Sequence, residues 1–296
     1  MTDYYVRIVS DSWSLVEDFW AVGEGVAYKD VIQSQLGTHY ADAGEDILTT
    51  LQKRFHGSHF HKLQLGPGEY FPRMARPEST RSDCSPGYNP DRSHAALTAR
   101  TTSTGQLHAL IQQLQEICRV VHPIEQNLNA YGHEIRNILI IACTEVEAHW
   151  KNILVANGQQ ANSRLDYVKV SPAMKLGAYR VALPWYPWLD SIAPFEQWIP
   201  TSPGVRQCLP WYDAYNAVKH DREQNFAAAK LKHAIEALTG CFVMLCAQYG
   251  LDFVRTGEGA RDVFFRLVDR PTWAATEIYV PSFGATSGPK NYPFGP

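Results

Sequence analysis

The strongest constraint on the fold is the apolar periodicity of residues 231–249. Large apolar side chains recur there in alternating steps of four and three: Leu231, Ile235, Leu238, Phe242, Leu245 and Tyr249. This spacing returns to one side of an α-helix, so it predicts a long helix with an apolar strip. Such a strip needs helical partners, which come from the same bundle or from a second copy of the chain.

Two further long helices are predicted upstream. Residues 107–121 keep one side apolar: Leu107, Leu110, Ile111, Leu114, Ile117 and Val121. Residues from about 130 to 156 repeat the four-and-three spacing: Ile135, Leu139, Ala142, Val146, His149 and Ile153. Pro123 ends the first segment, and Asn157-Gly158 closes the second. A shorter helix is expected from Pro210, because a first helical turn does not need the N–H that proline lacks.

Composition indicates a globular chain without a membrane span. Hydrophobic residues make up 45% and charged residues 19% of the 296 positions. The longest apolar runs, residues 138–143 and 241–247, are far shorter than the roughly 18 residues that a span requires. The first residues lack the pattern of a signal peptide, so we expect a cytoplasmic protein. The net charge of −3 gives no overall attraction to phosphate, so contact with RNA would depend on a local patch.

Cysteine usage agrees with this expectation. Four of the six cysteines lie inside apolar helical patterns: Cys118, Cys143, Cys241 and Cys246. No Cys-x-x-Cys pair occurs in the sequence, so neither a disulfide framework nor a thiolate zinc site is indicated. We expect these four side chains to be small buried hydrophobes.

The chain is expected to begin with a mixed region, residues 1–92. Residues 4–9 fit a short strand, and residues 12–20 and 45–55 fit helices. From residue 56 to residue 92 the density of Gly, Pro, Ser and His rises, which indicates an irregular linker.

The remainder is expected to be a helical domain, residues 93–251, with a short C-terminal region. Residues 163–205 form an insertion, in which two alternating runs predict a small β-hairpin before a Trp- and Pro-rich loop. Residues 252–296 are expected to form a second hairpin, around Arg270-Pro271, and a tail that packs on the insertion. The expected fold class is therefore mainly α.

Residues 211–222 carry the polar side chains that are best suited to catalysis or binding. At 100° per residue, Asp213, Asn216 and His220 fall on one side of the helix that begins at Pro210. Trp211 and Tyr215 fall on the other side, with Val218 and Arg222. The segment therefore combines an apolar side that packs with a polar side suited to a site.

An amphipathic helix with a polar residue and a His four positions later, in a mostly helical domain, resembles the HEPN superfamily of prokaryotic defence and toxin proteins. The signature of that family is Arg, then a polar residue such as Asn, then three to five residues and a His. Asn216 and His220 match this pattern, whereas Tyr215 stands at the Arg position. The similarity covers roughly residues 105–250 in helix order and only a few positions in motif.

The resemblance implies a HEPN-like bundle and a metal-independent ribonuclease in which two chains pair to form one composite site. His220 would be the acid or base, because imidazole can move the proton of a 2′-hydroxyl. Asn216 and Asp213 would orient the reacting groups. Arg136, from the preceding core helix, or Lys219 would neutralise the scissile phosphate. The expected role is an RNA-cleaving effector in phage defence or in a toxin system.

Substrate contacts are expected from the aromatic loop and from Arg222. The side chains of Trp185, Tyr186 and Trp188 are suited to stacking against bases, although aromatic side chains also cover hydrophobic cores and form interfaces. Arg222 lies about 200° around the helix from His220, so pairing with a carboxylate of the core helix is an equally simple role.

Alternative chemistries have weaker support. Glu145 and His149, four apart on the core helix, have the types of metal ligands, but one hydrogen bond between the two explains the spacing equally well. The loop histidines 56, 59 and 61 lack a nearby carboxylate or Cys, and no glycine-rich nucleotide motif or nucleophile elbow is present. We therefore expect neither a metal nor a cofactor.

The competing functional hypothesis is a module without catalytic activity. In this interpretation the polar side of the helix and the aromatic loop recognise a protein or a nucleotide, or hold two copies of the chain together. The absence of Arg at residue 215 is its main support.

Overall fold

The computed structural model describes residues 2–8, 16–30, 37–77, 89–199, 209–250, 264–282 and 288–295. The chain divides into two compact units. The first, here called the sheet unit, comprises Met1–Phe71, Arg76–Tyr88 and Thr272–Lys290. The second, the helical unit, comprises Pro72–Ala75, Asn89–Pro271 and Asn291–Pro296.

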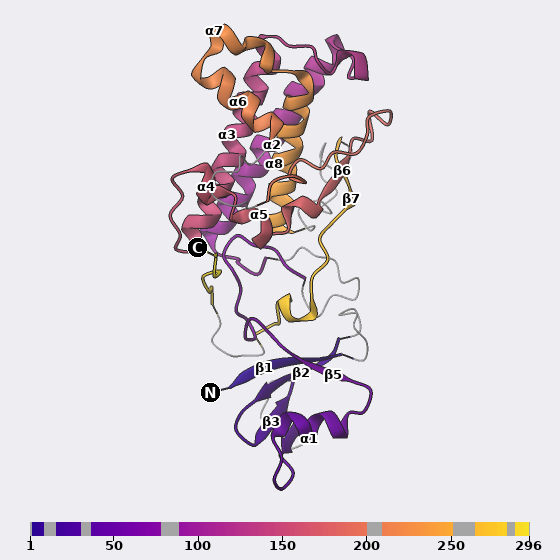
Figure 1. The fold of residues 1–296 in the computed structure, drawn as a ribbon, viewed down its shortest axis with the longest axis vertical. Helices are drawn as coiled ribbons and strands as arrows, with labels where there is room; N and C mark the ends of the chain where they lie inside the picture. The colour runs from indigo at the N-terminus through magenta and orange to yellow at the C-terminus, as the bar shows by residue number, and fades with distance from the viewer. Residues whose placement is uncertain are drawn as a thin grey trace. The chain divides into compact units, whose positions relative to one another are not determined.

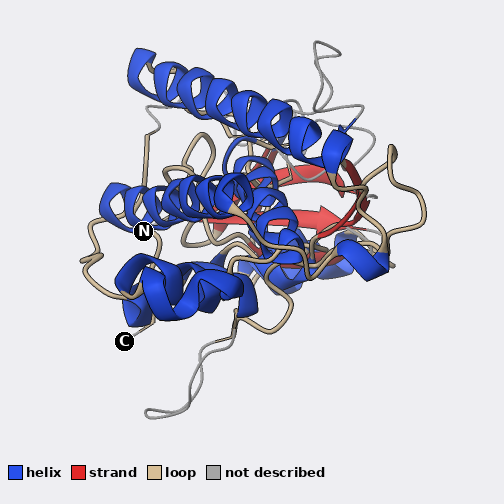
Figure 2. Ribbon diagram, turned by 90° about the horizontal axis from the view of Figure 1, so that it is seen from above, coloured by secondary structure: helices blue, strands red, loops and turns tan. Residues whose placement is uncertain are grey.

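The sheet unit contains a five-stranded antiparallel sheet, drawn in red in Figure 2. Its strands are β1 (Asp3–Ile8), β2 (Val16–Val22), β3 (Val26–Lys29), β4 (Thr38–Tyr40) and β5 (His59–Lys62). Their order across the sheet is β4-β3-β2-β1-β5, and four of them are labelled in Figure 1. The expectation of a mainly α protein is therefore wrong: the fold is mixed α/β. The strand expected at residues 4–9 is confirmed, whereas β2 occupies part of the segment expected to be a helix.

Both faces of this sheet are covered at its centre, where β1 and β2 carry most of its buried apolar side chains. Val6 and Ile8 point to one face, where C-terminal residues such as Ile278 and Val280 pack against them. The opposite face carries Trp20 and is covered by helix α1 (Ile47–Arg54) through its apolar side. The sheet unit thus has a three-layered core built from segments at both ends of the sequence.

The helical unit is built around helix α8 (Leu231–Tyr249). All of its side chains are buried except those of Lys232 and Glu236, which is the pattern of a central helix. Helices α2 (His94–Val120), α3 (His133–Ala156) and α6 (Pro210–His220) all pack against it (Figure 1). The helices expected in these segments are confirmed, and the apolar strip of α8 is covered within one chain.

Neither expected hairpin forms. Strand β6 (Arg180–Ala182) pairs with the distant strand β7 (Arg266–Asp269) in a separate two-stranded sheet. The run expected to be the first strand of the insertion is instead helix α4 (Arg164–Tyr167), because Ser163 and Asp166 form a capping box that starts a helix. Strand β7 of the C-terminal region therefore pairs with β6 of the insertion and not with a second strand of its own region.

Short elements connect these parts. They are α5 (Val170–Ala173), α7 (Arg222–Asn225), and the 3-10 turns η3 (Glu125–Asn127), η4 (Leu176–Ala178), η5 (Phe226–Ala228) and η6 (Ala275–Glu277). None of the described helices is both long and apolar enough to cross a bilayer.

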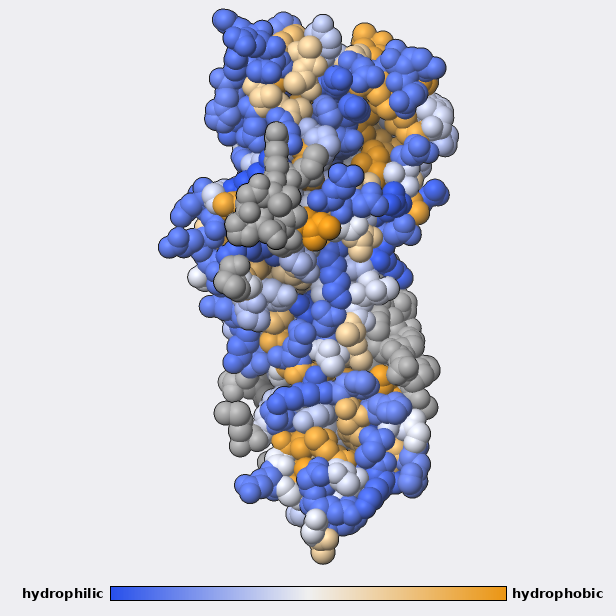
Figure 3. Space-filling view, viewed as in Figure 1, coloured by the Kyte–Doolittle hydropathy of each residue, from blue (hydrophilic) through white to orange (hydrophobic). Residues whose placement is uncertain are grey.

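The surface in view in Figure 3 is largely hydrophilic, with apolar patches between the polar side chains. The four helical cysteines are buried and free, as expected for small hydrophobes. Burial raises the pKa of Cys118 and of Cys143, so these thiols are poor nucleophiles.

Candidate functional site

Helix α6 is fixed in the helical unit by an aromatic cluster. Pro210 occupies the first turn, and the indole of Trp211 donates to the carbonyl of Pro194 at 3.0 Å. Trp150 of α3 lies against Trp211 and Trp198, with ring centroids 6.3 and 4.2 Å away. Because large aromatic side chains dominate packing energetics, this cluster positions α6 against α3.

Beyond the aromatic cluster, α3 and α6 are joined by four polar side chains, here called the Glu147 cluster: Glu147, Tyr212, Tyr215 and Lys219. The hydroxyls of Tyr212 and Tyr215 both donate to the Glu147 carboxylate, the latter at 3.0 Å. The Lys219 ammonium donates to the Tyr215 hydroxyl at 2.7 Å and lies 4.0 Å from the carboxylate. A carboxylate, two phenols and an ammonium therefore form one continuous network.

The charges of this network are well defined. The hydrogen bond to Tyr215 raises the pKa of Lys219, so its ammonium stays charged. Burial raises the pKa of Tyr215 more than the hydrogen bond from Lys219 lowers it, so the phenol stays neutral and can donate to Glu147. Burial and Glu147 raise the pKa of Tyr212 in the same way.

The network opens to solvent at one end. The Glu147 side chain is 23% exposed, whereas that of Lys219 is 46% exposed. His220, the last residue of α6, is also exposed. An anchored cation and an imidazole are therefore both exposed at the end of α6, on consecutive residues whose side chains leave the helix about 100° apart.

Asp213 and Asn216 are engaged in other contacts. The Asp213 carboxylate accepts a hydrogen bond from Arg164 at 2.6 Å, and the Arg164 guanidinium lies over the Tyr212 ring, 5.2 Å from its centroid. The Asn216 amide donates to the carbonyl of Tyr212 in its own helix at 2.9 Å. Both side chains are half-buried, so each has a structural contact in addition to any part in chemistry.

Arg136 lies near the beginning of α3, on the turn after His133. The His133 ring lies 4.9 Å from that of Phe226, so this end of α3 is beside the chain that follows α6. The Arg136 guanidinium donates to Asn137 at 3.0 Å, while its buried Nε has no hydrogen-bond partner among the described residues. The cation is therefore at the same end of the helical unit as the end of α6.

The aromatic loop lies at the opposite end of α6. Trp185 and Trp188 are 48% and 50% exposed. The Trp188 indole donates to the carbonyl of Pro123 at 2.8 Å, and its ring borders a groove of about 390 Å³ together with Trp211. Trp211 is nine residues from His220, or about 14 Å along the helix, so the loop does not line the exposed end of the Glu147 cluster.

Tyr186 and Arg222 are the other two residues that were expected to contact the substrate. The Tyr186 ring packs against Trp188 and Phe264, with centroids 5.9 and 6.1 Å away. The side chain of Arg222 lies outside the described residues.

The metal alternative gains no support. His149 is buried, and its Nδ1 lies 3.1 Å from the amide nitrogen of Gln248. Burial, and then the nearby charge of Arg73, lower the pKa of His149 to about 3, so the ring is neutral. Within the described ranges no group of three or more His, Cys, Asp or Glu side chains is placed to hold a metal.

The sequence reasoning missed Glu147, Tyr212 and Tyr215 as parts of one cluster. A signal for it exists, because residues 212, 215 and 219 lie at helical spacing on one side of α6. Their partner on α3 is about 65 positions away in the sequence, so no local pattern identifies it.

Comparisons with known proteins give no relative. No protein-family model matches the chain, and neither a curated protein nor a solved structure is similar to it.

Proposed function

We propose that the helical unit cleaves RNA without a metal ion, in the manner implied by the HEPN resemblance, as a cytoplasmic effector in phage defence or in a toxin system. The observation that carries the proposal is the exposed His220 at the end of α6, one residue after Lys219, whose ammonium Tyr215 and Glu147 hold in place. Tyr215 occupies the Arg position of the signature, and it anchors the Lys219 cation there.

The two exposed groups have complementary chemistry. The imidazole of His220 accepts the proton of a ribose 2′-hydroxyl, whose oxygen then attacks the adjacent phosphorus. The Lys219 ammonium neutralises the charge that develops on the phosphate oxygens. The departing 5′-oxygen needs a proton, which a second imidazole supplies when two copies of the chain pair through the exposed ends of their α6 helices.

The direct test is cleavage of RNA by the purified full chain. Wild type is incubated with tRNA and with total RNA, with and without EDTA, and compared with His220→Ala. We expect cleavage that EDTA leaves unchanged and that His220→Ala abolishes. His59→Ala, which removes an exposed imidazole from the sheet unit, is the matched control and should cleave like wild type. Cleavage that His220→Ala leaves intact would refute the proposed role of this residue.

A second candidate is a binding module without catalytic activity. It is favoured by Asp213 and Asn216, because both already have partners within the helical unit. This candidate predicts that wild type retards RNA in a gel-shift assay but leaves it uncut.

Light scattering tests the composite site of the first candidate separately, because a strict monomer at working concentration contradicts a site that is built from two chains.

A further inference from the structure

A second cavity in the helical unit has the chemistry of an anion site. It measures about 220 Å³ and is lined by segments from four parts of the chain. Its charged lining residues are Arg73, Arg92, Arg100 and Asp91. Three guanidinium groups and one carboxylate give the lining a net charge of 3 − 1 = +2.

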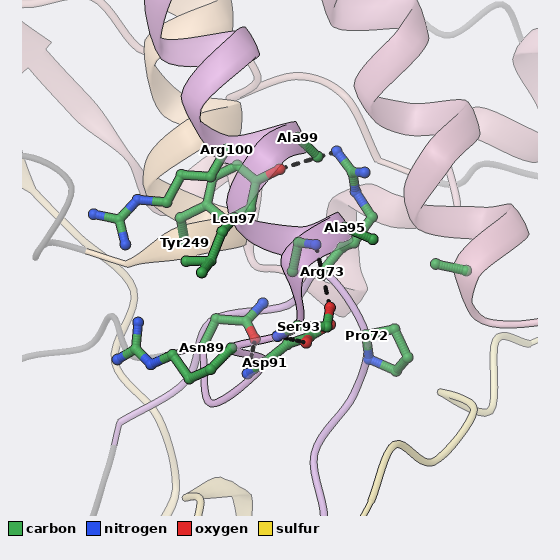
Figure 4. Close-up of a pocket in the computed structure, with 13 residues that line it drawn as sticks. Pro72, Arg73, Asn89, Asp91, Ser93, Ala95, Leu97, Ala99, Arg100 and Tyr249 are labelled. Atoms are coloured by element: carbon green, nitrogen blue, oxygen red, sulfur yellow. Dashed lines mark hydrogen bonds between the residues drawn. The ribbon is translucent and has the colours of Figure 1, made fainter.

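The guanidinium of Arg73 is held from behind by buried groups. Its Nε donates to the side-chain oxygen of Gln248 at 2.9 Å. Its Nη2 donates to the hydroxyl of Tyr249 at 3.2 Å, as Figure 4 shows. Gln248 is fully buried, and its amide nitrogen faces the neutral ring of His149. These contacts orient Arg73 and use two of its five N–H groups, so donors remain for a ligand.

The backbone also singles out Arg73. It has a φ of 57°, in the left-handed region that favours glycine. A side chain at such a position strains the backbone, and such strain concentrates at functional sites. The guanidinium is therefore held by specific contacts on a backbone that would suit glycine better.

Arg100 brings a second cation to the lining of the cavity. It extends from α2 and is half-buried, and its charge acts on the Tyr249 hydroxyl from a different segment than Arg73 does. Burial raises the pKa of Tyr249, while Arg73 and Arg100 both oppose the rise. The hydroxyl therefore stays protonated and neutral between two cations.

Part of the remaining lining is small and apolar. Pro72, Ala95, Ala96 and Ala99 line the cavity, so short side chains leave its interior open. The carboxylate of Asp91 accepts a hydrogen bond from the backbone N–H of Ser93 at 2.9 Å, which ties it to the loop that precedes α2 (Figure 4). An anion can thus approach the arginines without displacing a large side chain.

We propose that this cavity binds the phosphate group of a small phosphorylated molecule, with Arg73 and Arg100 as its main ligands. Guanidinium groups match phosphate geometry, because they donate two parallel hydrogen bonds. The volume is below the roughly 300–1,000 Å³ typical of pockets for drug-sized ligands, so it fits a phosphate with little else. The rest of the molecule then lies outside the cavity, over Leu97 and Arg92 at its rim.

This site is separate from the Glu147 cluster and does not depend on the proposed RNA cleavage. Ala156, which lines the cavity, and Glu147 are nine residues apart on α3, or about 14 Å along the helix. The two proposals can therefore fail independently.

The test is calorimetric titration of the full chain at fixed ionic strength. Inorganic phosphate and AMP are titrated separately into wild type, Arg73→Gln, Arg100→Gln and Arg119→Gln. Arg119 is the matched control, because it lies at the other end of α2, where it pairs with Glu116 on the surface. We expect saturable binding to wild type and to Arg119→Gln, and affinity at least about tenfold lower in the other two variants, as for the loss of one charged hydrogen bond.

The two ligands distinguish the sources of the phosphate. Equal affinity for both identifies the phosphate alone as the recognised group, whereas tighter AMP binding adds contacts at the rim. Absence of binding to both ligands refutes the proposal, and so does an equal loss in Arg100→Gln and Arg119→Gln. Arg100 is half-exposed on a helix, so thermal melting of its variant verifies that the fold is kept even if Arg73→Gln unfolds.

Discussion

Two polar clusters, each built around one carboxylate, are organised differently in the two units. In the sheet unit, Asp18 accepts hydrogen bonds from Arg7 at 2.9 and 2.7 Å, and it also binds Trp20 and Lys29. Its side chain is only 1% exposed. In the helical unit, the Glu147 carboxylate is 23% exposed and belongs to a network that ends at a surface ammonium.

The difference indicates what each cluster does. A buried carboxylate must be fully hydrogen-bonded, and Asp18 meets this requirement within the sheet unit. The carboxylate itself is closed off from solvent, although Lys29 at the edge of the network is 41% exposed, and its role is to hold strands β1, β2 and β3 together. The Glu147 network is satisfied on its buried side only, so Lys219 keeps donors for a group outside the protein. A carboxylate enclosed by its hydrogen-bond donors stabilises the fold, whereas an exposed ammonium with unused donors can bind a group outside the protein.

The closed cluster should give the largest effect. Asp18→Ala leaves the Arg7 guanidinium buried without its partner, and breaking such a pair typically costs about 3–5 kcal/mol of unfolding free energy. Urea denaturation measures the change. Asp3→Ala is the control, because it breaks the exposed pair with Lys62, which should contribute far less. Similar losses in the two variants would contradict the structural role of Asp18.

The same cluster predicts an acid-dependent loss of stability. Burial raises the pKa of Asp18, but the hydrogen bonds from Arg7, Trp20 and Lys29 outweigh it, so the folded-state pKa is lowered. The ionised carboxylate therefore stabilises the fold above its unfolded pKa of about 3.9, and this contribution is lost as pH falls through the lower folded value.

The measurement compares wild type with Asp18→Asn across pH. The difference in unfolding free energy should be constant above about pH 5 and shrink below about pH 4. A difference that stays constant down to pH 2 would show that the charge of Asp18 does not matter. Asp3→Asn provides the exposed comparison.

The helices were the predictable part of the fold, whereas of the five-stranded sheet only β1 was predicted. Helix α8 has an uninterrupted four-and-three strip, which only a helix explains. Strand β2 is covered on both faces, with Phe19 on one side and Trp20 on the other, so its sequence lacks the alternation of a half-exposed strand. The pairing of β6 with β7 joins residues nearly ninety positions apart, beyond the reach of any local pattern.

The candidate site, like the fold, was predictable from the sequence only in part. Helical spacing placed His220 on the polar side of α6, and this residue is exposed. The same reasoning treated Tyr215 as a packing residue that stands where the signature has an arginine, and it did not identify the partners of the hydroxyl, which depend on how α3 packs against α6. Glu147 gives Tyr215 its role, and that contact is formed by tertiary packing alone.

The smallest effect on stability, and the most selective effect on function, is expected from Tyr215→Phe. Tyr212→Phe is its matched control, since each change removes one hydroxyl that donates to Glu147. Each should cost about 0.5–1.5 kcal/mol, the usual net worth of one hydrogen bond. Only Tyr215 also anchors Lys219, so only Tyr215→Phe frees the ammonium to move. If the proposed RNA cleavage occurs, its rate should fall by about tenfold to a hundredfold in Tyr215→Phe, because misplacing a charged group by about 1 Å has effects of this size. Equal rates in the two variants would mean that the open end of the network takes no part in the reaction, and the contrast with the closed Asp18 cluster would then be one of exposure alone.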